Sequence, residues 1–308
     1  MPVIEVSNLS KQFKNVLAVD DLSFTVNEGD VYGFLGQNGA GKSTTIRMLL
    51  TLVRPTQGHI RIFSTDLSKG RHEILQQTGA IIEKPDLYKY LSAYDNLSIF
   101  ARLSGLKHSR KNVMEKLESV GLSARSGSKV KTFSQGMKQR LGIAVALIHN
   151  PKLIILDEPS NGLDPQGIAD MRGLILSLRE LGKTVVISSH LLSEIEQVAT
   201  RMIIIHKGKK IVEGSVSELL DPSETVVRIQ TSDNEFARRK ILSSEFAALL
   251  QNDVDELRLK MNKNDVPSLV HNLSDWNVHI LSIQPRHSLE DYFISLTNTV
   301  RHVEPVTD

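Results

Sequence analysis

The sequence predicts an α/β fold built on a parallel sheet. The first observation is an apolar run, Val31–Leu35, that enters a glycine-rich turn and then a helical segment over residues 44–52. The second is a pair of apolar segments, 153–156 and 184–187, separated by a helical pattern over 165–181. Short apolar runs that alternate with helices are typical of buried strands in a parallel sheet. This order of strand, helix and strand therefore predicts the sheet.

Further strands and helices surround this core. Apolar and polar residues alternate over residues 1–30, which predicts antiparallel strands there. Residues 95–150 have helical patterns, with Ser109 placed to cap one helix and a last helix over 134–148. The later expected elements are a strand over 202–206, a turn at Lys207–Lys209 and a polar linker that ends near Asp221–Pro222.

The pattern restarts after residue 222, which predicts a second domain over 223–308. This segment is expected to contain strands at 226–230, 256–261 and 278–283, helices at 235–250, 266–273 and 288–296, and a polar tail after Thr297. Residues 1–222 hold 28 basic and 22 acidic side chains, whereas residues 223–308 hold 9 and 13. This uneven charge supports two domains, and the acidic balance of the second argues against a surface for nucleic acid.

Composition excludes several classes of protein. The 308 residues are 40% hydrophobic and 23% charged, which is typical of globular proteins and not of disordered or collagen-like chains. The chain has no cysteine, so disulfides, thiol nucleophiles and cysteine-bound zinc are excluded. No apolar run approaches the roughly 18 residues needed to span a membrane, and the first residues do not resemble a secretion signal. We therefore expect a chain that is neither exported nor membrane-spanning by itself.

A phosphate-binding loop follows the first buried strand. Its residues match the pattern G-x-x-x-x-G-K-[ST] between a strand and a helix, and they are Gly36, Gln37, Asn38, Gly39, Ala40, Gly41, Lys42 and Ser43, with Thr44 next. Glycines let the backbone N–H groups wrap phosphates, Lys42 adds a positive charge, and Ser43 offers a hydroxyl to Mg²⁺. A turn that only links strand and helix is the alternative, but such a turn has no need of Lys42 and Ser43.

Two carboxylates end the strand at 153–156. Asp157 and Glu158 follow four apolar residues, at the sheet edge where α/β proteins bind ligands. Asp157 is placed to hold Mg²⁺ directly or through water, and Glu158 to orient and polarise an attacking water molecule. Two acids could instead form an ordinary solvated strand end, although the upstream phosphate loop favours the catalytic interpretation.

The segment Phe133–Met137 resembles the signature of the ATP-binding cassette family, with Gln135 and Met137 replacing a glycine and a glutamine. Ser134 is a good helix N-cap, and the helix that follows directs its positive end at Ser134 and Gly136. The resemblance covers about residues 1–220. It implies a phosphate-loop ATPase cassette with a mixed sheet, an N-terminal antiparallel subdomain and a helical subdomain at about 84–150. It also implies that two copies sandwich two Mg–ATP, each signature helix facing the other copy's phosphate.

Three more positions resemble motifs of this family. Asp164, in the segment 160–165, matches an aspartate that bridges the two copies, although Pro165 also makes this segment an ordinary helix start. His190 matches a histidine that contacts the γ-phosphate, and a structural histidine is the alternative. Phe13 matches the aromatic residue that stacks on adenine, and packing in the core or at its edge is the alternative.

Glu83 departs from the family pattern. It follows the expected strand end at Thr78–Ile82, where the family usually has a glutamine near the metal. A glutamate there is similar to the subgroup associated with lantibiotic immunity and bacitracin resistance. The resemblance therefore implies that Glu83 helps to bind Mg²⁺ and links the nucleotide to the membrane partner. Residues 223–308 resemble a small accessory domain of export-type subunits, which ends in a motif like the one at 288–293.

These observations lead to one expected function and one alternative. The first is an ATPase subunit that drives a separately encoded membrane permease, an exporter of peptide antibiotic, drug or lipid-like cargo. Such a subunit would be cytoplasmic, at the inner face of the cell membrane, and would act as a homodimer with ATP and Mg²⁺. The alternative is a nucleotide-switched protein that acts on ribosomes or DNA. Relatives of that kind usually have two cassettes or a long coiled-coil insertion, and this sequence has neither.

Overall fold

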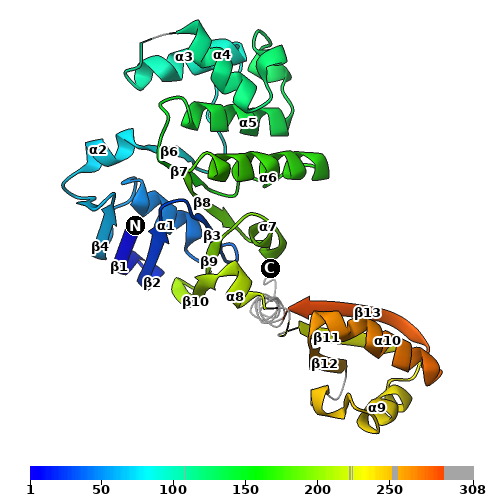
Figure 1. Cartoon of the computed structure of the whole chain (residues 1–308). Coiled ribbons are helices and arrows are strands. Elements are labelled where there is room, and N and C mark those ends of the chain that lie inside the picture. The colour runs from blue at the N-terminus through cyan, green and yellow to red at the C-terminus, as the bar shows by residue number, and fades with distance from the viewer. Residues whose placement is uncertain (108, 222, 224, 252–255, 288–308) are drawn as a thin grey trace, which may run out of the picture. The chain divides into compact units, whose positions relative to one another are not determined.

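The computed structural model describes residues 1–107, 109–221, 223, 225–251 and 256–287. The chain divides into two compact units, Met1–Val216 and Ser217–Asp308 (Figure 1). Each unit has its own sheet system and its own apolar core. None of the helices that the structure describes is both long and apolar enough to cross a membrane.

The first unit begins with an antiparallel sheet of order β2-β1-β4-β5. Its strands are β1 (Pro2–Phe13), β2 (Val16–Asn27), β4 (Gln57–Ile62) and β5 (Thr65–Asp66). The alternation over residues 1–30 places Ile4, Leu22 and Val26 at 0% exposure, on the face turned to the core. The predicted antiparallel strands are confirmed, and β4 and β5 are additional to the sequence prediction.

The main sheet has six strands in the order β10-β9-β3-β8-β7-β6. Its strands are β3 (Val31–Leu35), β6 (Thr78–Ile81), β7 (Leu153–Leu156), β8 (Thr184–Ser189), β9 (Arg201–His206) and β10 (Lys209–Ser215). All neighbouring pairs are parallel except β9 and β10. Every residue of β3, β7 and β8 is buried. The parallel sheet predicted from these apolar runs is therefore confirmed.

The polar linker predicted after Lys209 is wrong, because β10 and the short helix α8 (Val216–Leu219) occupy it. Lys207 and Gly208 have positive φ angles of 47° and 81°. Two such residues form the tight turn that joins antiparallel strands, so β10 folds back on β9. Most of β10 is half-buried or exposed at the sheet edge, which explains its polar sequence.

Among the described residues, the α-helices of this unit that precede α8 are α1 (Lys42–Leu49), α2 (Arg71–Gln76), α3 (Ala93–Leu103), α4 (Arg110–Ser119), α5 (Gln135–Ala146), α6 (Pro165–Glu180) and α7 (Leu192–Glu196). Figure 1 shows α3, α4 and α5 lying together at the end of this unit away from the antiparallel sheet. Ser109 caps α4 as predicted. The helix predicted over residues 44–52 ends earlier, and Thr51 just beyond it has a φ of 60°.

Helix α1 is fixed by the core of the first unit. Ile46, Met48 and Leu49 are all at 0% exposure and belong to a cluster that includes Phe34 of β3 and Ile155 of β7. A buried helix packed at native density can shift little relative to the strands around it. The phosphate loop that starts α1 is therefore held at a defined position above the sheet.

The described residues of the second unit form an antiparallel sheet of order β12-β11-β13 with the α-helices α9 and α10. Its elements are β11 (Thr225–Thr231), α9 (Asn234–Leu242), β12 (Leu257–Met261), α10 (Val266–Asp275) and β13 (Ile280–His287). The helix predicted over 235–250 is too long, because α9 ends at Leu242 and a separate 3₁₀ turn follows at Ala247–Leu249. The helix predicted over 288–296, the terminal motif at 288–293 and the tail lie outside the described residues.

Candidate functional site

The phosphate loop connects β3 to α1 and has close backbone contacts. A Cβ atom added at Gly36 would lie 2.6 Å from the Ile205 carbonyl oxygen, and one at Gly41 would lie 2.6 Å from that of Ala18. Gly41 also has a φ of 106°, a conformation that favours glycine. Glycine is therefore required at both positions for the loop to curl between β9 and β2.

Helix α1 leaves its first N–H groups open to a ligand. Gly41 at the N-cap offers no side-chain acceptor, and the first turn contains no acidic residue. The Nε2 atom of Gln37 is buried and has no hydrogen-bond partner among the described residues. A positive helix end together with an unsatisfied amide donor fits an anion such as a phosphate.

Lys42 is 5% exposed and all three of its N–H donors have nearby acceptors. Its Nζ atom donates to the carbonyl oxygens of Gly36 at 2.7 Å and Gln37 at 3.2 Å. The same atom lies 3.0 Å from Oε1 of Glu158. That carboxylate oxygen accepts no directed hydrogen bond, so the contact is mainly electrostatic. A phosphate that takes Lys42 must therefore compete with these three acceptors.

Asp157 follows β7 and has one oxygen without a partner. The Oγ atom of Ser188 donates to Oδ1 of Asp157 at 2.6 Å, and the side chain is 1% exposed. Oδ2 is buried and accepts no hydrogen bond from the described residues. Leaving a buried carboxylate oxygen unsatisfied costs free energy. Since carboxylate oxygens suit Mg²⁺ or water bound to it, Asp157 fits the predicted metal role.

Glu158 lies between two basic side chains. Its Oε2 atom is 2.9 Å from Nδ1 of His190, and its Oε1 atom faces Lys42. Its backbone N–H donates to Oγ of Ser188 at 2.8 Å. The φ of Glu158 is 50°, a left-handed conformation that costs a non-glycine residue about 1–3 kcal/mol. The structure thus joins Lys42, Glu158 and His190, three residues that the sequence places far apart.

Glu83 is paired with a neighbouring arginine. It has a φ of 60°, its side chain is 66% exposed, and it forms an ion pair with Nη2 of Arg47 on α1. Across the described residues, no group of three or more histidine, aspartate and glutamate side chains is arranged to hold a metal ion. A metal bound by Ser43 and Asp157 would therefore need further ligands from the nucleotide or water.

The signature segment and the segment containing Asp164 meet at one cavity of about 320 Å³, which Ser134, Gly136 and Asp164 all line. Ser134 caps α5 by accepting from the N–H of Met137 at 3.2 Å. Asp164 caps α6 by accepting from the N–H of Gly167 at 2.8 Å. No hydrogen bond or ion pair in the described part of the chain joins these three residues to the phosphate loop.

Phe13 ends β1 and is 43% exposed. The Nζ atom of Lys11 lies 4.8 Å from the centre of its ring. Val16 and Leu17 at the start of β2 are also exposed, at 62% and 45%. The β1–β2 hairpin therefore presents an aromatic ring with apolar neighbours, a surface on which a nucleobase can stack.

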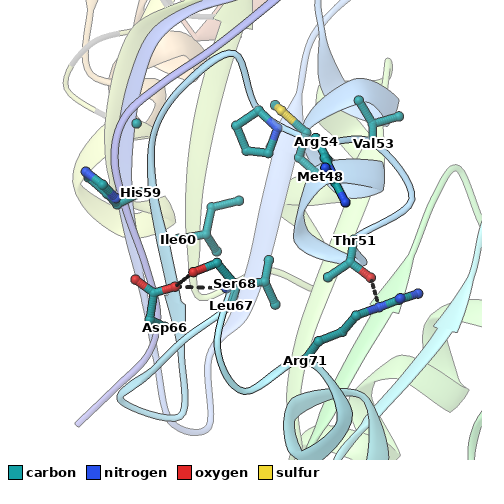
Figure 2. A pocket seen from close by; sticks show the side chains of 12 residues that line it. Met48, Thr51, Val53, Arg54, His59, Ile60, Asp66, Leu67, Ser68 and Arg71 are labelled. Carbon is teal, nitrogen blue, oxygen red and sulfur yellow. Dashed lines mark hydrogen bonds between the residues drawn. The ribbon is translucent and has the colours of Figure 1, made fainter.

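A cavity of about 490 Å³ lies elsewhere on the first unit, where α1 ends beside β4 and the start of α2 (Figure 2). Nε of Arg71 donates to Oγ1 of Thr51 at 2.7 Å. Ser68 donates to Asp66 from its hydroxyl and its backbone N–H, and these bonds lower the pKa of Asp66. None of the site residues predicted from the sequence lines this cavity.

Sequence reasoning missed Ser188. Its hydroxyl contacts both the Asp157 carboxylate and the Glu158 backbone. The available signal was the polar pair Ser188–Ser189 at the end of a strand that otherwise consists of a threonine and three apolar residues. A buried serine needs hydrogen-bond partners, and the carboxyl end of a parallel strand is where site residues gather.

Comparison with known proteins gives consistent matches. A family model described as "ABC transporter" matches residues 19–161. The chain is 40% identical over 303 residues to the uncharacterized ABC transporter ATP-binding protein YhcH of Bacillus subtilis, covering 97% of each chain. It is 42% identical over 299 residues to the bacitracin transport ATP-binding protein BcrA of Bacillus licheniformis, covering 96% of this chain and 97% of BcrA.

A shorter relative and a solved structure match the first part of the chain. The lantibiotic transport ATP-binding protein SrtF of Streptococcus pyogenes is 40% identical over 238 residues, which are 77% of this chain and 100% of SrtF. A solved ATP-binding subunit of an ABC transporter is 31% identical with a TM-score of 0.63, covering 70% of this chain and 91% of that one.

Proposed function

This chain belongs to the ATP-binding cassette transporter family as an ATP-binding subunit with ATPase activity, and on that premise we propose how its residues share the work of hydrolysis. Two copies of the chain bind two Mg–ATP between them. The phosphate loop of one copy and the signature segment of the other form each site. The hydrolysis powers a separate membrane permease.

Within one copy, Lys42 and the loop backbone bind the phosphates, and His190 contacts the γ-phosphate. Glu158 acts on the attacking water, because its carboxylate lies between Lys42 and His190, the two side chains that would contact the phosphate. Ser43 and Asp157 would hold Mg²⁺, and Glu83 is a further candidate ligand if it leaves Arg47. Bound Mg²⁺ supplies positive charge to the phosphate oxygens.

The observation that carries the shared site is the separation of two sets of residues. Ser134 and Asp164 line a cavity of their own, and no hydrogen bond or ion pair of the described residues ties them to the phosphate loop. The exposed N-terminus of α5 can bind an anion, and its first turn contains no acidic residue. A second copy, which brings its γ-phosphate to this helix end, gives Ser134, Gly136 and Asp164 a function.

We propose export of a peptide antibiotic or similar cargo, because relatives over nearly the whole chain include a protein named for bacitracin transport. A shorter relative is named for lantibiotic transport. A further relative, which matches 96% of this chain, is named for linearmycin resistance. The glutamate at position 83 is consistent with the first two groups. The permease would keep this subunit at the inner face of the cell membrane.

Antibiotic protection in cells tests this proposal. The chain is expressed with its candidate permease in a sensitive host, and growth inhibition by bacitracin and by a lantibiotic is measured. We expect protection from at least one of them, lost with Lys42→Ala and with Glu158→Gln. Lys111→Ala is the matched control, because Lys111 is 83% exposed and pairs only with Glu115 among the described residues. Copurification with ribosomes or DNA in place of a membrane protein would contradict the proposal.

A further inference from the structure

Ser188 connects the two site carboxylates through one buried hydroxyl. It is at 0% exposure near the end of β8, beside the end of β7. Its Oγ atom donates to Oδ1 of Asp157 at 2.6 Å and accepts from the N–H of Glu158 at 2.8 Å. A hydroxyl has only one proton to donate, so the donor is committed to Asp157 and the acceptor side to Glu158.

We propose that Ser188 is a positioning residue that orients both carboxylates for hydrolysis. Its bond to Oδ1 fixes the rotation of the Asp157 side chain and leaves Oδ2 as the unsatisfied oxygen, which a metal ion or its water could take. Its bond to the N–H of Glu158 supports the left-handed backbone at a φ of 50°. This inference rests on the proposed metal role of Asp157.

The neighbouring serine shows that Ser188 is placed differently from other buried hydroxyls of this strand. Ser189 is 2% exposed and also forms two hydrogen bonds, donating to Oε2 of Glu194 at 2.8 Å and accepting from the N–H of Leu191 at 3.0 Å. Consecutive strand residues face opposite sides of the sheet. Loss of either hydroxyl removes two hydrogen bonds, but of these two serines only Ser188 contacts Asp157 and Glu158.

The effect on the metal site can be measured without hydrolysis. The full chain with ADP is titrated with Mn²⁺, and bound Mn²⁺ is followed by electron paramagnetic resonance. For Ser188→Ala we expect Mn²⁺ affinity to fall about 10- to 100-fold, the usual effect of losing a residue that orients a metal ligand. ADP affinity in EDTA should stay within about twofold of wild type, because Glu158 keeps its charge near Lys42 and no hydrogen bond of the described residues joins Ser188 to the phosphate loop.

Two controls separate positioning from general destabilisation. Ser189→Ala also loses two hydrogen bonds of a side chain in β8 and should keep Mn²⁺ affinity within about twofold of wild type. Steady-state kinetics should show a lower kcat for Ser188→Ala with a KM for ATP close to wild type, because the loss is in orientation of Glu158. If Ser188→Ala does not fold, Ser188→Cys replaces it in the titration, because cysteine is similar in size to serine and is a weaker donor. Ser188→Cys should lose Mn²⁺ affinity relative to wild type, by less than the loss expected for Ser188→Ala.

The outcome of Asp157→Asn distinguishes the two levels of the argument. If Asp157→Asn keeps normal Mn²⁺ affinity, the proposed metal role of Asp157 is wrong. If Asp157→Asn loses Mn²⁺ while folded Ser188→Ala or Ser188→Cys binds it like wild type, the positioning role of Ser188 is overturned. Equal losses in Ser188→Ala and Ser189→Ala would also overturn it, because the effect would then be one of general stability.

Discussion

Replacing Glu158 with glutamine should tighten ADP binding as well as slow hydrolysis. Glu158 is the one carboxylate that the described residues place within ion-pair distance of Lys42. Both side chains are largely buried, at 5% and 16% exposure. In the nucleotide-free site, Glu158 is thus paired with the Lys42 ammonium group that would otherwise bind a phosphate. Glu158→Gln keeps the size of the side chain and removes its charge.

The size of this effect follows from the 3.0 Å separation of Nζ and Oε1. At an effective dielectric constant of about 20, two unit charges at that distance attract by about 5–6 kcal/mol. Desolvation of both groups offsets much of this attraction, and Glu158 also interacts with His190. A net contribution of about 1.4–2.8 kcal/mol corresponds to an ADP affinity about 10- to 100-fold tighter in Glu158→Gln.

Isothermal titration with ADP measures this effect, because ADP is not hydrolysed and its affinity reports on the phosphate loop. The matched control is His190→Ala, which removes the second partner of Glu158 and leaves its charge beside Lys42. That variant should not bind ADP more tightly than wild type. An ADP affinity of Glu158→Gln equal to or weaker than wild type would refute the view that Glu158 competes for Lys42.

Three further predictions concern residues away from this charge pair. Glu83→Ala should keep its melting temperature and ATP binding, because an exposed ion pair contributes about 0–1 kcal/mol to stability. The same variant should lose permease-stimulated hydrolysis, whereas Glu83→Gln should keep most ATPase activity. Transport at the normal rate by Glu83→Ala would contradict the proposed role of Glu83. Truncation after Asp221 should leave ATP binding intact by calorimetry, and a folded truncated chain that cannot bind ATP would show that the boundary is misplaced. Burial lowers the pKa of His149 in the folded state, so the folded chain binds fewer protons than the unfolded one. The free energy of unfolding should therefore fall as pH drops below 6.5. Urea titrations of His149→Gln should show a weaker pH dependence of this free energy, and an unchanged dependence would contradict the role given to His149.

The strands that the sequence predicted are those whose apolar pattern is independent of distant contacts. Val31–Leu35 and Leu153–Leu156 are buried on both faces, and such runs have few other interpretations. By contrast, β4 contains Gly58 and His59, and its Ile60 and Ile62 are buried in the core of the first unit where β4 pairs with β1. Its alternation is short, so pairing with β1 rather than its own sequence establishes the strand.

Local motifs identified most of the candidate site, whereas its internal contacts depend on the fold. The phosphate loop and the Asp157–Glu158 pair are each contiguous in sequence, with residue types that a phosphate and a metal require. The ion pair of Glu83 with Arg47 joins residues 36 positions apart, and the Ser188 bonds span about 30. No local pattern encodes such contacts, because they arise when helix α1 packs beside the sheet and when the carboxyl ends of β7 and β8 come together.

Mixing two inactive variants tests the shared site most directly. Lys42→Ala disables the phosphate loop, and Ser134→Arg blocks the N-terminus of α5 with a long cationic side chain. If each site combines the two copies, a mixed dimer contains one intact site, and random pairing should restore roughly a quarter of the wild-type ATPase activity. Activity no greater than the sum of the two separate variants, with mixed dimers confirmed by mass, would contradict the account.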